Sequence, residues 1–559
     1  MHPIRANEER IREYRASGSW HDETLSTAFE QALAARPDEI ALIDPPNKSA
    51  LVGSAPLKLT FRQLDEAARK LSAMLHGLGL RQHDRIVVQM PNTVEIVYTY
   101  LAAARLGLII SPVAMQYRSS ELSHIVETIE PRAYLACASF NGADYAADVA
   151  DVFNDECVQI RFGQKTADDK TDHIEWFDEA NPEPMETWPS ISADHIFTVC
   201  WTSGTTGRSK GVPRTHNHWN AIALTNTEAI DIAAGEALLN PFPLINMAAI
   251  GGFLYVWLKR QARLVLHHPF EPGIFLSQLQ DERVSYTIAP PAVLNMLLAQ
   301  RDTLLTKFDL SNLRIIGSGS APLAPEMIEG YKALLNIDII NFFGSNEGMA
   351  IIGAPDDVAS STDRARYFPR FGASGFTWTN QGGNQFKSKL ISLETGTEIT
   401  EPGITGELHI SGPTVFDGYY RSPEDNALAF AKDGHFRTGD LFQIAGPENR
   451  FYQFVGRCKD LIVRGGMNIS PEELDIVIAS HPDIIEAAVC AYPDDVMGEK
   501  VCAVVVLGPD KSLSVADLSA FLEQCGIAKF KWPERLVKVD ALPRNPLNKV
   551  PRAELSQFL

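Results

Sequence analysis

Short apolar runs alternate with helical patterns along much of the chain between residues 85 and 335. Each run reads as a buried strand, and the stretch that follows repeats its apolar residues at helical spacing. This alternation is typical of parallel sheets covered by helices, so it predicts an α/β fold. The strand–helix pairs are 85–90 with 93–106, 262–268 with 273–281, 285–290 with 291–300, and 313–322 with 324–335.

The pattern changes at about residue 386, where short strands and turns replace the strand–helix pairs. We predict an antiparallel, barrel-like part here, a distorted β-barrel that belongs to the same large domain. The segment 141–190 is acidic and poor in periodicity, and we expect surface structure there. The short runs are KLISL, GELHISG, FQIAG and RFYQFVG.

The last hundred residues show a third pattern, a small α+β arrangement. A helix is predicted at 470–481, because it opens with Ser-Pro-Glu-Glu: Ser as N-cap, Pro at the first helical position and Glu closing a capping box. Strands AAVCAYP and KVCAVVVL follow, and then a helix near 514–525. We therefore predict a large N-terminal domain over 1–455 and a small mobile C-terminal domain over 456–559.

Composition and charge narrow the range of partners. The chain has 559 residues, with 50 Lys plus Arg against 70 Asp plus Glu, for a formal charge of −20. Nucleic-acid binders and proteins of anionic membranes need a basic face, so we expect neither partner. A small anionic ligand is still compatible, because a few cations and backbone N–H groups can hold it.

The chain also reads as a cytoplasmic protein without membrane insertion. Its first twenty residues lack the apolar stretch of a secretory signal. The most apolar region, 98–115, is interrupted by Arg105 and Pro112 and is too short to cross a bilayer. The seven cysteines form no CxxC pair, so we expect reduced thiols, most of them in the core.

The most informative stretch is TSGTTGRSKG at 202–211, which follows the apolar run IFTVCW. Glycines allow close backbone approach, hydroxyls and N–H groups donate, and Lys210 or Arg208 offsets negative charge. These residues predict a phosphate-binding loop, although the spacing is not that of a Walker A motif. The alternative is an ordinary polar turn.

This loop resembles the signature of the adenylate-forming (AMP-binding) enzymes, which include acyl- and aryl-CoA ligases, peptide-synthetase adenylation domains and luciferases. Four further motifs of the family follow in the right order, and together the five cover most of the chain. They are NFFGSNE at 341–347, HFRTGDL at 435–441, GRCKD through RGGMN at 456–468, and PRNPLNK at 543–549.

The resemblance implies ATP, Mg²⁺ and coenzyme A as cofactor and co-substrates, and it assigns roles to matching residues. Lys549 would contact the attacking carboxylate and α-phosphate, Glu347 would hold Mg²⁺, and Lys210 would serve the phosphate loop. Asp440 and Arg457 would bind the ribose. The remaining predicted nucleotide site consists of Thr202, Ser203, Gly204, Thr205, Thr206 and Gly207 at the phosphates, Gly319, Ser320, Ala321 and Phe343 around adenine, and Gly344 and Asn346 beside Glu347.

In this family the small domain rotates about a hinge between the two half-reactions. Lys459 stands at the hinge position, and Gly465 with Gly466 would line the pantetheine tunnel. The chain departs from the family at Asn346, where Thr is usual, and at Phe343, where Tyr is commoner. Neither departure puts the activity in doubt, because Asn still donates and accepts hydrogen bonds and stacking needs no phenol.

The chain looks closest to stand-alone aryl-acid adenylating enzymes, and this likeness bears on the acid. Those enzymes read a ring hydroxyl with a Pro-x-x-His-Asn segment, where this chain has Asn246 and Met247. An apolar site cannot recognise a hydroxyl, so the segment Met247–Ile250 favours an apolar acyl group. Asn246, Met247, Ile250 and Gly251 are the predicted substrate residues, although the apolar run is equally compatible with plain core packing.

The leading hypothesis is an AMP-forming acid–CoA ligase for an alicyclic, short- or medium-chain aliphatic, or unsubstituted aryl acid, with cyclohexanecarboxylate as best single candidate. No carrier domain follows residue 559, so we expect a separate acceptor. The alternative is a siderophore-type enzyme that loads a carrier protein. A non-catalytic homologue ranks last, because Lys210, Glu347, Asp440 and Lys549 are all present. Oligomeric state and pathway are not predicted.

Overall fold

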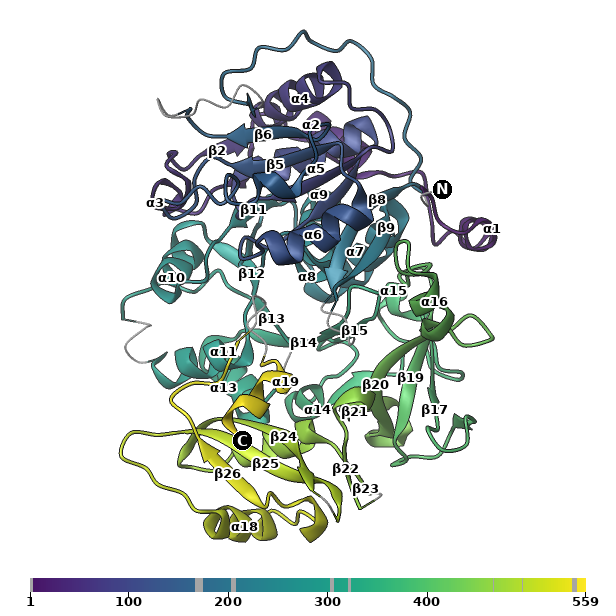
Figure 1. The fold of residues 1–559 in the computed structure, drawn as a ribbon, viewed down its shortest axis with the longest axis vertical. Helices are drawn as coiled ribbons and strands as arrows, with labels where there is room; N and C mark the ends of the chain where they lie inside the picture. Colours follow the sequence, from purple (N-terminus) through teal and green to yellow (C-terminus); the bar gives the residue numbers. More distant parts are fainter. Residues whose placement is uncertain are drawn as a thin grey trace. The chain divides into compact units, whose positions relative to one another are not determined.

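The computed structural model describes residues 4–165, 174–202, 208–301, 306–319, 323–465, 467–494, 496–544 and 550–559, which are drawn in colour in Figure 1. The chain divides into two compact units. The first comprises Met1–Lys387 with Ile410–Phe436, and the second comprises Ser388–His409 with Arg437–Leu559. The predicted boundary at 455–460 lies within the second unit, at the short helix η4 (Cys458–Asp460), and as a hinge it stays a prediction.

The first unit contains a sheet of eight strands, in the order β15-β14-β13-β12-β10-β11-β1-β2. The six inner strands run parallel, whereas the outer strands β2 and β15 pair antiparallel with their neighbours. The strands are β1 (Ile40–Ile43), β2 (Lys58–Thr60), β10 (Ala237–Asn240), β11 (Arg263–Leu266), β12 (Val284–Ile288), β13 (Ile315–Gly319), β14 (Asp338–Gly344) and β15 (Ala350–Gly353).

A second sheet of the same unit has seven strands, in the order β7-β6-β5-β3-β4-β8-β9. It is parallel from β7 to β8, and β9 returns antiparallel beside β8. The strands are β3 (Arg85–Gln89), β4 (Ile109–Pro112), β5 (Ala133–Cys137), β6 (Val158–Phe162), β7 (Ile174–Trp176), β8 (Ile196–Thr202) and β9 (Lys210–Thr215).

Helices lie between these two sheets and share one apolar core with them. The helix α5 (Val94–Leu106) is buried along nearly its whole length, which explains why its sequence is apolar on all sides. The other helices of this layer are α2 (Leu25–Ala35), α4 (Phe61–Gly77), α7 (His216–Ile230), and the run α8 (Met247–Ala249), η2 (Ile250–Leu254) and α9 (Tyr255–Arg260). None of the described helices is long and apolar enough to span a membrane.

The outer faces of the two sheets have cores of their own. On the eight-stranded sheet, α10 (Pro272–Asp281), α11 (Pro291–Ala299) and α13 (Pro325–Leu335) cover the outer face, and α6 (Ser119–Ile129) covers that of the seven-stranded sheet. The strand–helix pairs predicted from the sequence are thus confirmed. The remaining elements of the unit are α1 (Glu8–Ala16), α3 (Lys48–Val52), η1 (Ala150–Val152), α14 (Ser361–Arg366), β16 (Tyr367–Pro369), α15 (Gln381–Asn384) and α16 (Pro423–Ala429).

The prediction that segment 141–190 is surface structure is wrong for β6. This strand lies inside the seven-stranded sheet, between β5 and β7, and Ile160 and Phe162 are buried. Its Arg161 is buried as well, 5.5 Å from the ring centre of Tyr134. The sequence did not predict β6 as a buried strand, because a charged residue such as Arg161 in an acidic stretch is typical of a surface segment.

A buried histidine fixes the junction between α7, α2 and α9. His216 opens α7 and stacks on Phe197, with ring centres 4.3 Å apart. Its Nδ1 accepts a hydrogen bond from the Leu25 N–H (3.2 Å) and lies 2.8 Å from the Tyr255 hydroxyl. Burial lowers the pKa of His216 from 6.5 to about 3, so the ring is neutral in the folded protein.

The second unit begins with the strand run β21-β20-β19-β17-β18 of a six-stranded sheet, in which β20 pairs antiparallel with β21 and β17 with β18. Its strands are β17 (Lys387–Ile391), β18 (Glu398–Ile399), β19 (Gly406–Ser411), β20 (Phe436–Ala445) and β21 (Phe451–Arg457), with η3 (Pro447–Asn449) between the last two. These are the short runs from which the sequence predicts a barrel-like part.

The C-terminal part has a mixed sheet and its own core. Its strands are β22 (Ile462–Arg464), β23 (Met467–Ile469), β24 (Ile484–Asp494), β25 (Gly498–Leu507) and β26 (Arg535–Lys538), and its helices are α17 (Pro471–Ala479), α18 (Val515–Gln524), η5 (Lys529–Lys531), α19 (Arg552–Leu555) and η6 (Ser556–Phe558). The predicted α/β class with a large parallel-sheet part and a small α+β part is confirmed.

The start of α17 differs from the predicted capping box in one respect. Ser470 caps the helix, because its side chain accepts from the Glu473 N–H (3.4 Å). The Glu473 carboxylate, however, pairs with Lys531 at 2.7 Å instead of closing the box. A long-range ion pair has therefore replaced the local reciprocal bond.

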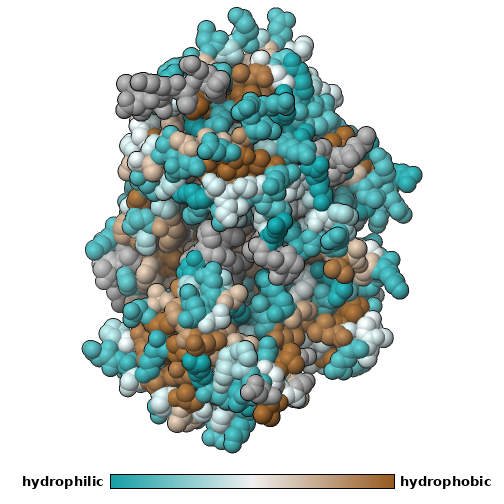
Figure 2. All heavy atoms as spheres, viewed as in Figure 1, coloured by the Kyte–Doolittle hydropathy of each residue, from teal (hydrophilic) through white to brown (hydrophobic). Residues whose placement is uncertain are grey.

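All seven cysteines are free thiols, and five of them are buried. This agrees with the expectation of reduced, mostly core cysteines. Figure 2 shows hydrophilic residues over much of the visible face, with apolar residues exposed among them. Among the described residues of the second unit, the exposed large apolar side chains are those of Leu393, Ile404, Val463, Met467, Ile476, Ile485 and Val496.

Candidate active site

The predicted phosphate loop joins the two antiparallel strands β8 and β9. Thr202 ends β8, Lys210 begins β9, and the two residues are direct partners across the hairpin. The loop therefore emerges where Thr202 and Lys210 face each other. The predicted residues Ser203, Gly204, Thr205, Thr206 and Gly207 lie outside the described part of the chain.

The Lys210 ammonium has two neighbours, both from the segment after β19. It lies 2.7 Å from the Asp425 carboxylate, at the start of α16, and 4.8 Å from the ring centre of Tyr419. The lysine side chain keeps 17% of its surface exposed. The pairing with Lys210 and a hydrogen bond from the Ser422 hydroxyl lower the pKa of Asp425.

Tyr419 also connects this lysine to the predicted metal ligand. Its hydroxyl donates to Glu347 Oε1 at 3.0 Å, just beyond β14. Burial, followed by the Glu347 charge and this hydrogen bond, raises the pKa of Tyr419 far above 10, so the hydroxyl stays protonated and can donate to the carboxylate. Tyr419 thus contacts both predicted residues, Lys210 through its ring and Glu347 through its hydroxyl.

Glu347 suits a magnesium ion that is shared with phosphates. The described residues contain no group of three or more His, Cys, Asp and Glu side chains that could hold a metal by themselves. Mg²⁺ is commonly bound by one or two carboxylates together with substrate phosphates and waters. Glu347 would be such a single carboxylate, and the ion would neutralise phosphate charge there.

Asn346, the residue before Glu347, is fixed on three sides. Its main-chain oxygen accepts from the Arg214 Nε at 2.8 Å, its Nδ2 donates to the Trp201 oxygen at 3.3 Å, and its Oδ1 accepts from the Met247 N–H at 2.9 Å. These contacts come from β9, β8 and α8 respectively. The segment that carries Glu347 is therefore anchored to both the phosphate-loop strands and the predicted acyl segment.

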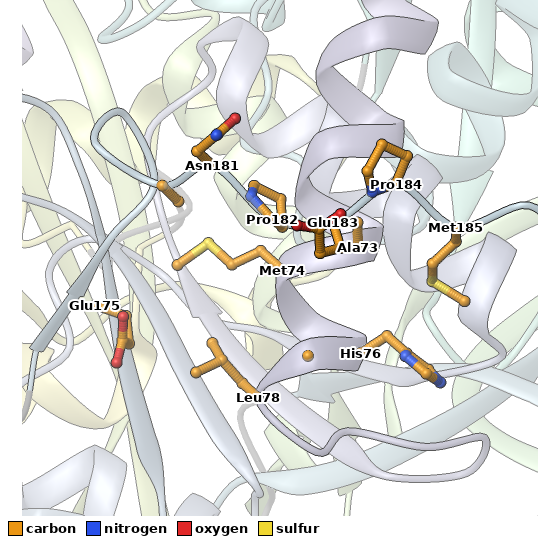
Figure 3. Close-up of a pocket in the computed structure, with 12 residues that line it drawn as sticks. Ala73, Met74, His76, Leu78, Glu175, Asn181, Pro182, Glu183, Pro184 and Met185 are labelled. Carbon is orange, nitrogen blue, oxygen red and sulfur yellow. The ribbon is translucent and has the colours of Figure 1, made fainter.

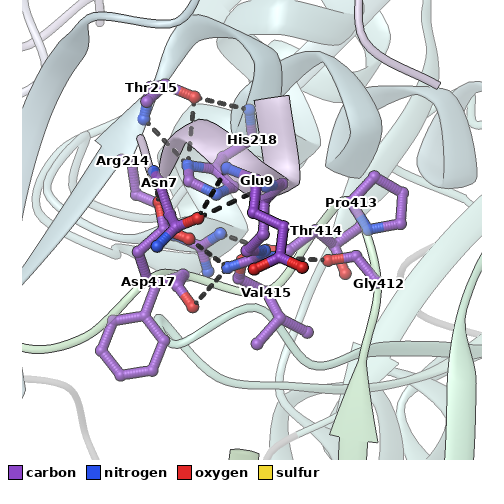
Figure 4. Close-up of polar contacts among 12 residues, drawn as sticks. Asn7, Glu9, Arg214, Thr215, His218, Gly412, Pro413, Thr414, Val415 and Asp417 are labelled. Carbon is purple, nitrogen blue, oxygen red and sulfur yellow. Dashed lines mark hydrogen bonds and ion pairs between the residues drawn. The ribbon is translucent and has the colours of Figure 1, made fainter. Parts of the chain in front are cut away.

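Arg214 was not among the residues predicted from the sequence. Its guanidinium is fully buried on β9, lies 5.5 Å from the ring centre of Trp219, and donates to the main-chain oxygens of Asn346 and Thr414. Burial lowers its pKa to about 10, so it still carries a charge at neutral pH. Figure 4 shows Arg214 beside Thr414, with Thr215 and His218 above them.

The segment 412–417, which contains Thr414, is held from a second side by the N-terminal helix. Arg10 of α1 pairs with Asp417 and donates to the main-chain oxygens of Gly412 (2.9 Å), Val415 (2.5 Å) and Phe416 (2.9 Å). The Phe416 N–H in turn donates to the main-chain oxygen of Glu347 at 2.9 Å. The N-terminal helix thus supports the predicted metal ligand through one intervening segment.

The predicted adenine-binding residues that can be placed are Gly319 and Phe343. They stand at the carboxyl ends of the neighbouring parallel strands β13 and β14, where ligands of open α/β sheets bind. A Cβ on Gly319 would lie 2.2 Å from the Phe342 oxygen, so only glycine fits. Ser320 and Ala321 lie outside the described residues.

The four predicted acyl-site residues form the start of one helical run. Asn246 is the N-cap of α8, and its Oδ1 accepts from the Ala249 N–H at 3.3 Å. Met247 is half-buried against the central core, whereas Ile250 is completely buried. Gly251 faces α7, because a Cβ there would lie 2.5 Å from Ile222 Cγ2.

In the second unit the two predicted ribose ligands form a pair. Asp440 on β20 and Arg457 on β21 are cross-strand partners, with Arg457 Nε 3.1 Å from the carboxylate. Glu407 supports this turn, because its Oε1 accepts from the Gly439 N–H at 3.1 Å. The Asp440 side chain is nearly buried, whereas that of Arg457 is 44% exposed. A ligand at this pair would therefore contact the exposed Arg457 side chain first.

The remaining predicted residues of this unit lie on exposed backbone. Lys459 is exposed in η4, and Gly465 sits in the turn between β22 and β23 with φ +58°. The Gly465 N–H donates to the Met497 oxygen at 2.8 Å, which ties the turn to the start of β25. Gly466 and Lys549 lie outside the described part of the chain.

The cavities within the first unit do not coincide with the predicted site residues. One of about 600 Å³ lies between the end of α4 and residues 175–185, as Figure 3 shows, and another of about 150 Å³ adjoins Tyr419 and Asn426. None of the predicted residues lines either of these two cavities. Met74, Leu78, Pro182, Pro184 and Met185 form much of the apolar wall of the larger one.

Comparison with known protein families shows to which family the chain belongs. Residues 29–420 match the AMP-binding enzyme family, and residues 473–549 match the AMP-binding enzyme C-terminal domain. The chain therefore belongs to the AMP-binding enzyme family, as its motifs predicted, and it is an AMP-forming acid–thiol ligase. ATP, Mg²⁺ and coenzyme A are what the CoA ligases of this family use.

Relatives match over almost the whole chain. It is 29% identical to the medium-chain fatty-acid–CoA ligase of Escherichia coli K12, over 97% of this chain and 92% of that protein. It is 26% identical to the 2,3-dihydroxybenzoate–AMP ligase of Bacillus subtilis, over 98% and 95%. The crystal structure of ATP-bound MatB from Rhodopseudomonas palustris superposes with a TM-score of 0.78, at 26% identity and over 96% and 99% of the chains.

Proposed function

We propose that this ligase activates an apolar carboxylic acid with ATP and transfers the acyl group to coenzyme A. The acid would be alicyclic, short- or medium-chain aliphatic, or an unsubstituted aryl acid, and cyclohexanecarboxylate is the best single candidate. In the first half-reaction a carboxylate oxygen attacks the α-phosphorus and pyrophosphate leaves. In the second, the thiol sulfur attacks the acyl carbon and AMP leaves.

The observation that carries the choice of acid is the packing of Met247. Its side chain packs against the central apolar core, and its methyl carbon reaches the backbone of Gly344. The side-chain amide oxygens of Asn246, the preceding residue, and of Asn346, which is bonded to the Met247 N–H, each accept a backbone N–H bond. An apolar wall whose nearby acceptors are occupied favours an acyl group without a hydroxyl, because such a wall offers it no partner.

The contacts of the first unit support specific roles at the nucleotide. We propose that Lys210 binds phosphate, that Glu347 binds Mg²⁺ with Tyr419 orienting its carboxylate, and that Phe343 stacks on adenine. Developing charge on the phosphates is best stabilised by groups already held in place, and these groups are held. Asp440 and Arg457 are proposed ribose ligands, and Lys549 is the proposed catalytic lysine of the first half-reaction.

The relatives support the CoA ligase activity, and one of them also supports a second candidate function. The E. coli medium-chain fatty-acid–CoA ligase favours an apolar acid and CoA. The B. subtilis 2,3-dihydroxybenzoate–AMP ligase is similar over the same extent and favours adenylation of an aryl acid, which is the first step of the carrier-loading alternative. The two functions differ in whether free CoA discharges the adenylate.

The test is a panel of acids with ATP and Mg²⁺, with and without CoA, in which pyrophosphate, AMP and thioester are followed. The acids are cyclohexanecarboxylate, benzoate, hexanoate, octanoate, salicylate and 2,3-dihydroxybenzoate. CoA-dependent turnover of the apolar acids is expected. Pyrophosphate exchange on the hydroxybenzoates without CoA turnover would instead establish carrier loading.

A variant links the outcome to Met247. Met247→Asn places a polar amide in the apolar wall and should lower kcat/KM for the preferred apolar acid by roughly 10- to 100-fold. Met296→Asn is the matched control, because Met296 is an exposed methionine of α11. Equal activity of Met247→Asn and the control on every acid would remove Met247 from the acyl site.

A further inference from the structure

The helical run 247–260 begins with an N–H group that its own segment does not satisfy. The first N–H groups of any helix lack intrahelical acceptors and need partners from elsewhere. The N-cap residue Asn246 accepts a hydrogen bond from the Ala249 N–H at 3.3 Å. The N–H of Met247, at the first helical position, therefore needs another acceptor. That N–H donates to Asn346 Oδ1 at 2.9 Å, from a residue 99 positions further along the chain.

The donor half of the same side chain is also used. Asn346 Nδ2 donates to the main-chain oxygen of Trp201 at 3.3 Å, one residue before the end of β8. One planar amide therefore joins the strand before the phosphate loop to the start of the acyl segment. A threonine carries one oxygen, one bond nearer the backbone, and cannot occupy both positions of the amide.

The side chain of Met247 returns to the same segment. Its Cε lies only 2.4 Å from where a Cβ on Gly344 would stand, so the methyl occupies the space that glycine leaves open. Met247 is thus attached to residues 344–346 twice, through its N–H and through its methyl. The next residue, Glu347, is the proposed metal ligand.

We infer that Asn346 and Gly344 determine acyl selectivity, by fixing where Met247 stands relative to the segment that carries Glu347. The inference deepens the proposed function and rests on it only for the choice of acids. Asn346 acts as a positioning residue: its side chain holds the first turn of the acyl helix. Gly344 provides the room for the Met247 methyl, and any side chain there moves that methyl.

Two variants test the two attachments. Asn346→Ala removes the acceptor of the Met247 N–H. Gly344→Ala leaves that acceptor in place and displaces the Met247 methyl, and its Cβ also comes within 2.9 Å of the Met349 main-chain oxygen. Each should change the ratio of kcat/KM between octanoate and cyclohexanecarboxylate, measured at saturating ATP, by about fivefold or more. Asn346→Thr should resemble Asn346→Ala.

Hydrogen exchange provides a readout that needs no activity. Peptides that cover 243–254 should exchange roughly tenfold faster at the Met247 amide in Asn346→Ala, because one buried hydrogen bond is lost. Gly344→Ala should leave this exchange unchanged. Asn341→Ala is the matched control: Asn341 lies on β14 and is buried, but its Nδ2 donates to the Arg364 oxygen at 3.0 Å.

The outcomes separate this inference from the proposed function. If no apolar acid is activated by the wild-type chain, the proposed function fails, while the exchange experiment still decides whether Asn346 holds the acyl helix. If Asn346→Ala lowers turnover of every acid by the same factor, or leaves the Met247 amide as protected as in Asn341→Ala, the inference is overturned.

Discussion

The Lys210 ammonium lies 2.7 Å from the Asp425 carboxylate, so the proposed phosphate-binding cation is already paired with an acid of its own chain. The nucleotide must share or displace this carboxylate, since both compete for one ammonium group. The ion pair therefore sets a cost on phosphate binding, and its size can be measured.

Asp425→Asn should lower the KM for ATP by up to about fivefold at low ionic strength. Half-exposed ion pairs contribute about 1 kcal/mol or less, which corresponds to that factor. The difference should shrink in high salt because screening weakens the pair. Glu424→Gln is the control, since it removes the same charge from an exposed neighbour on α16. A higher KM in Asp425→Asn would mean that Asp425 holds Lys210 in its working position.

Tyr419→Phe should raise the Mg²⁺ concentration for half-maximal pyrophosphate exchange by roughly tenfold. The change keeps the ring beside Lys210 and removes only the hydroxyl that donates to Glu347 Oε1. Losing the partner of a metal-binding carboxylate typically costs about 10- to 100-fold in metal affinity. Tyr331→Phe is the control, because the Tyr331 hydroxyl donates to the Leu294 oxygen on α11. An unchanged Mg²⁺ requirement would separate Tyr419 from metal binding.

Arg10→Ala should destabilise the segment 412–417 and lower the free energy of unfolding by about 2 to 3 kcal/mol. The guanidinium donates to three main-chain oxygens and pairs with Asp417, and a hydrogen bond to a charged group contributes about 1.5–3 kcal/mol. Because the arginine is partly exposed and water can replace some of these bonds, we expect a net loss of about one such bond. Hydrogen exchange in 410–420 should rise. Arg12→Ala, on the exposed side of α1, should leave both measurements near wild type.

Acidification should destabilise the first unit through His216. Its pKa is about 3 when folded and 6.5 in the unfolded chain, so only the unfolded state gains this proton as the pH falls. The stabilisation is complete above pH 6.5 and declines steadily toward pH 3, by about 2 kcal/mol between pH 7 and pH 5.

His216→Phe removes that titration and should shrink the change in Tm between pH 7 and pH 5, even if the variant is less stable at both. His21→Gln is the control at an exposed position. A pH dependence identical in His216→Phe and wild type would show that other groups cause the acid instability.

The sequence predicts the architecture well because most of the parallel strands and the helix α5 are largely apolar, and such runs have few alternatives. Prediction from the sequence fails where a polar residue is buried because its partner lies far away in the sequence. Arg161 disguised β6, and the partners of Arg214 lie 132 and 200 residues away. A charged residue between Pro213 and Thr215 in a buried strand is a signal that some partner exists, but the sequence does not say which.

The candidate site follows the same division. Motif order predicts Glu347, Asp440 and Arg457 as site residues, and Asp440 forms an ion pair with Arg457. The roles of Tyr419, Asp425 and Arg10 depend on the segment 412–425 meeting Glu347 and Lys210, which is a tertiary contact without a local pattern. Likewise, a local capping rule assigned Glu473 to Ser470, and a lysine 58 residues away competes for it.

The π-turn η2 (Ile250–Leu254) has a consequence for how this segment can change in evolution. A π-turn amounts to one residue inserted into an α-helix, and each α-helical residue adds about 100° of rotation and 1.5 Å of rise. Deleting one residue between 250 and 254 would restore a continuous α-helix and turn Met247 away from residues 344–346. A single insertion or deletion here would thus change the orientation of the whole proposed acyl segment at once, whereas a point substitution changes one side chain at a time.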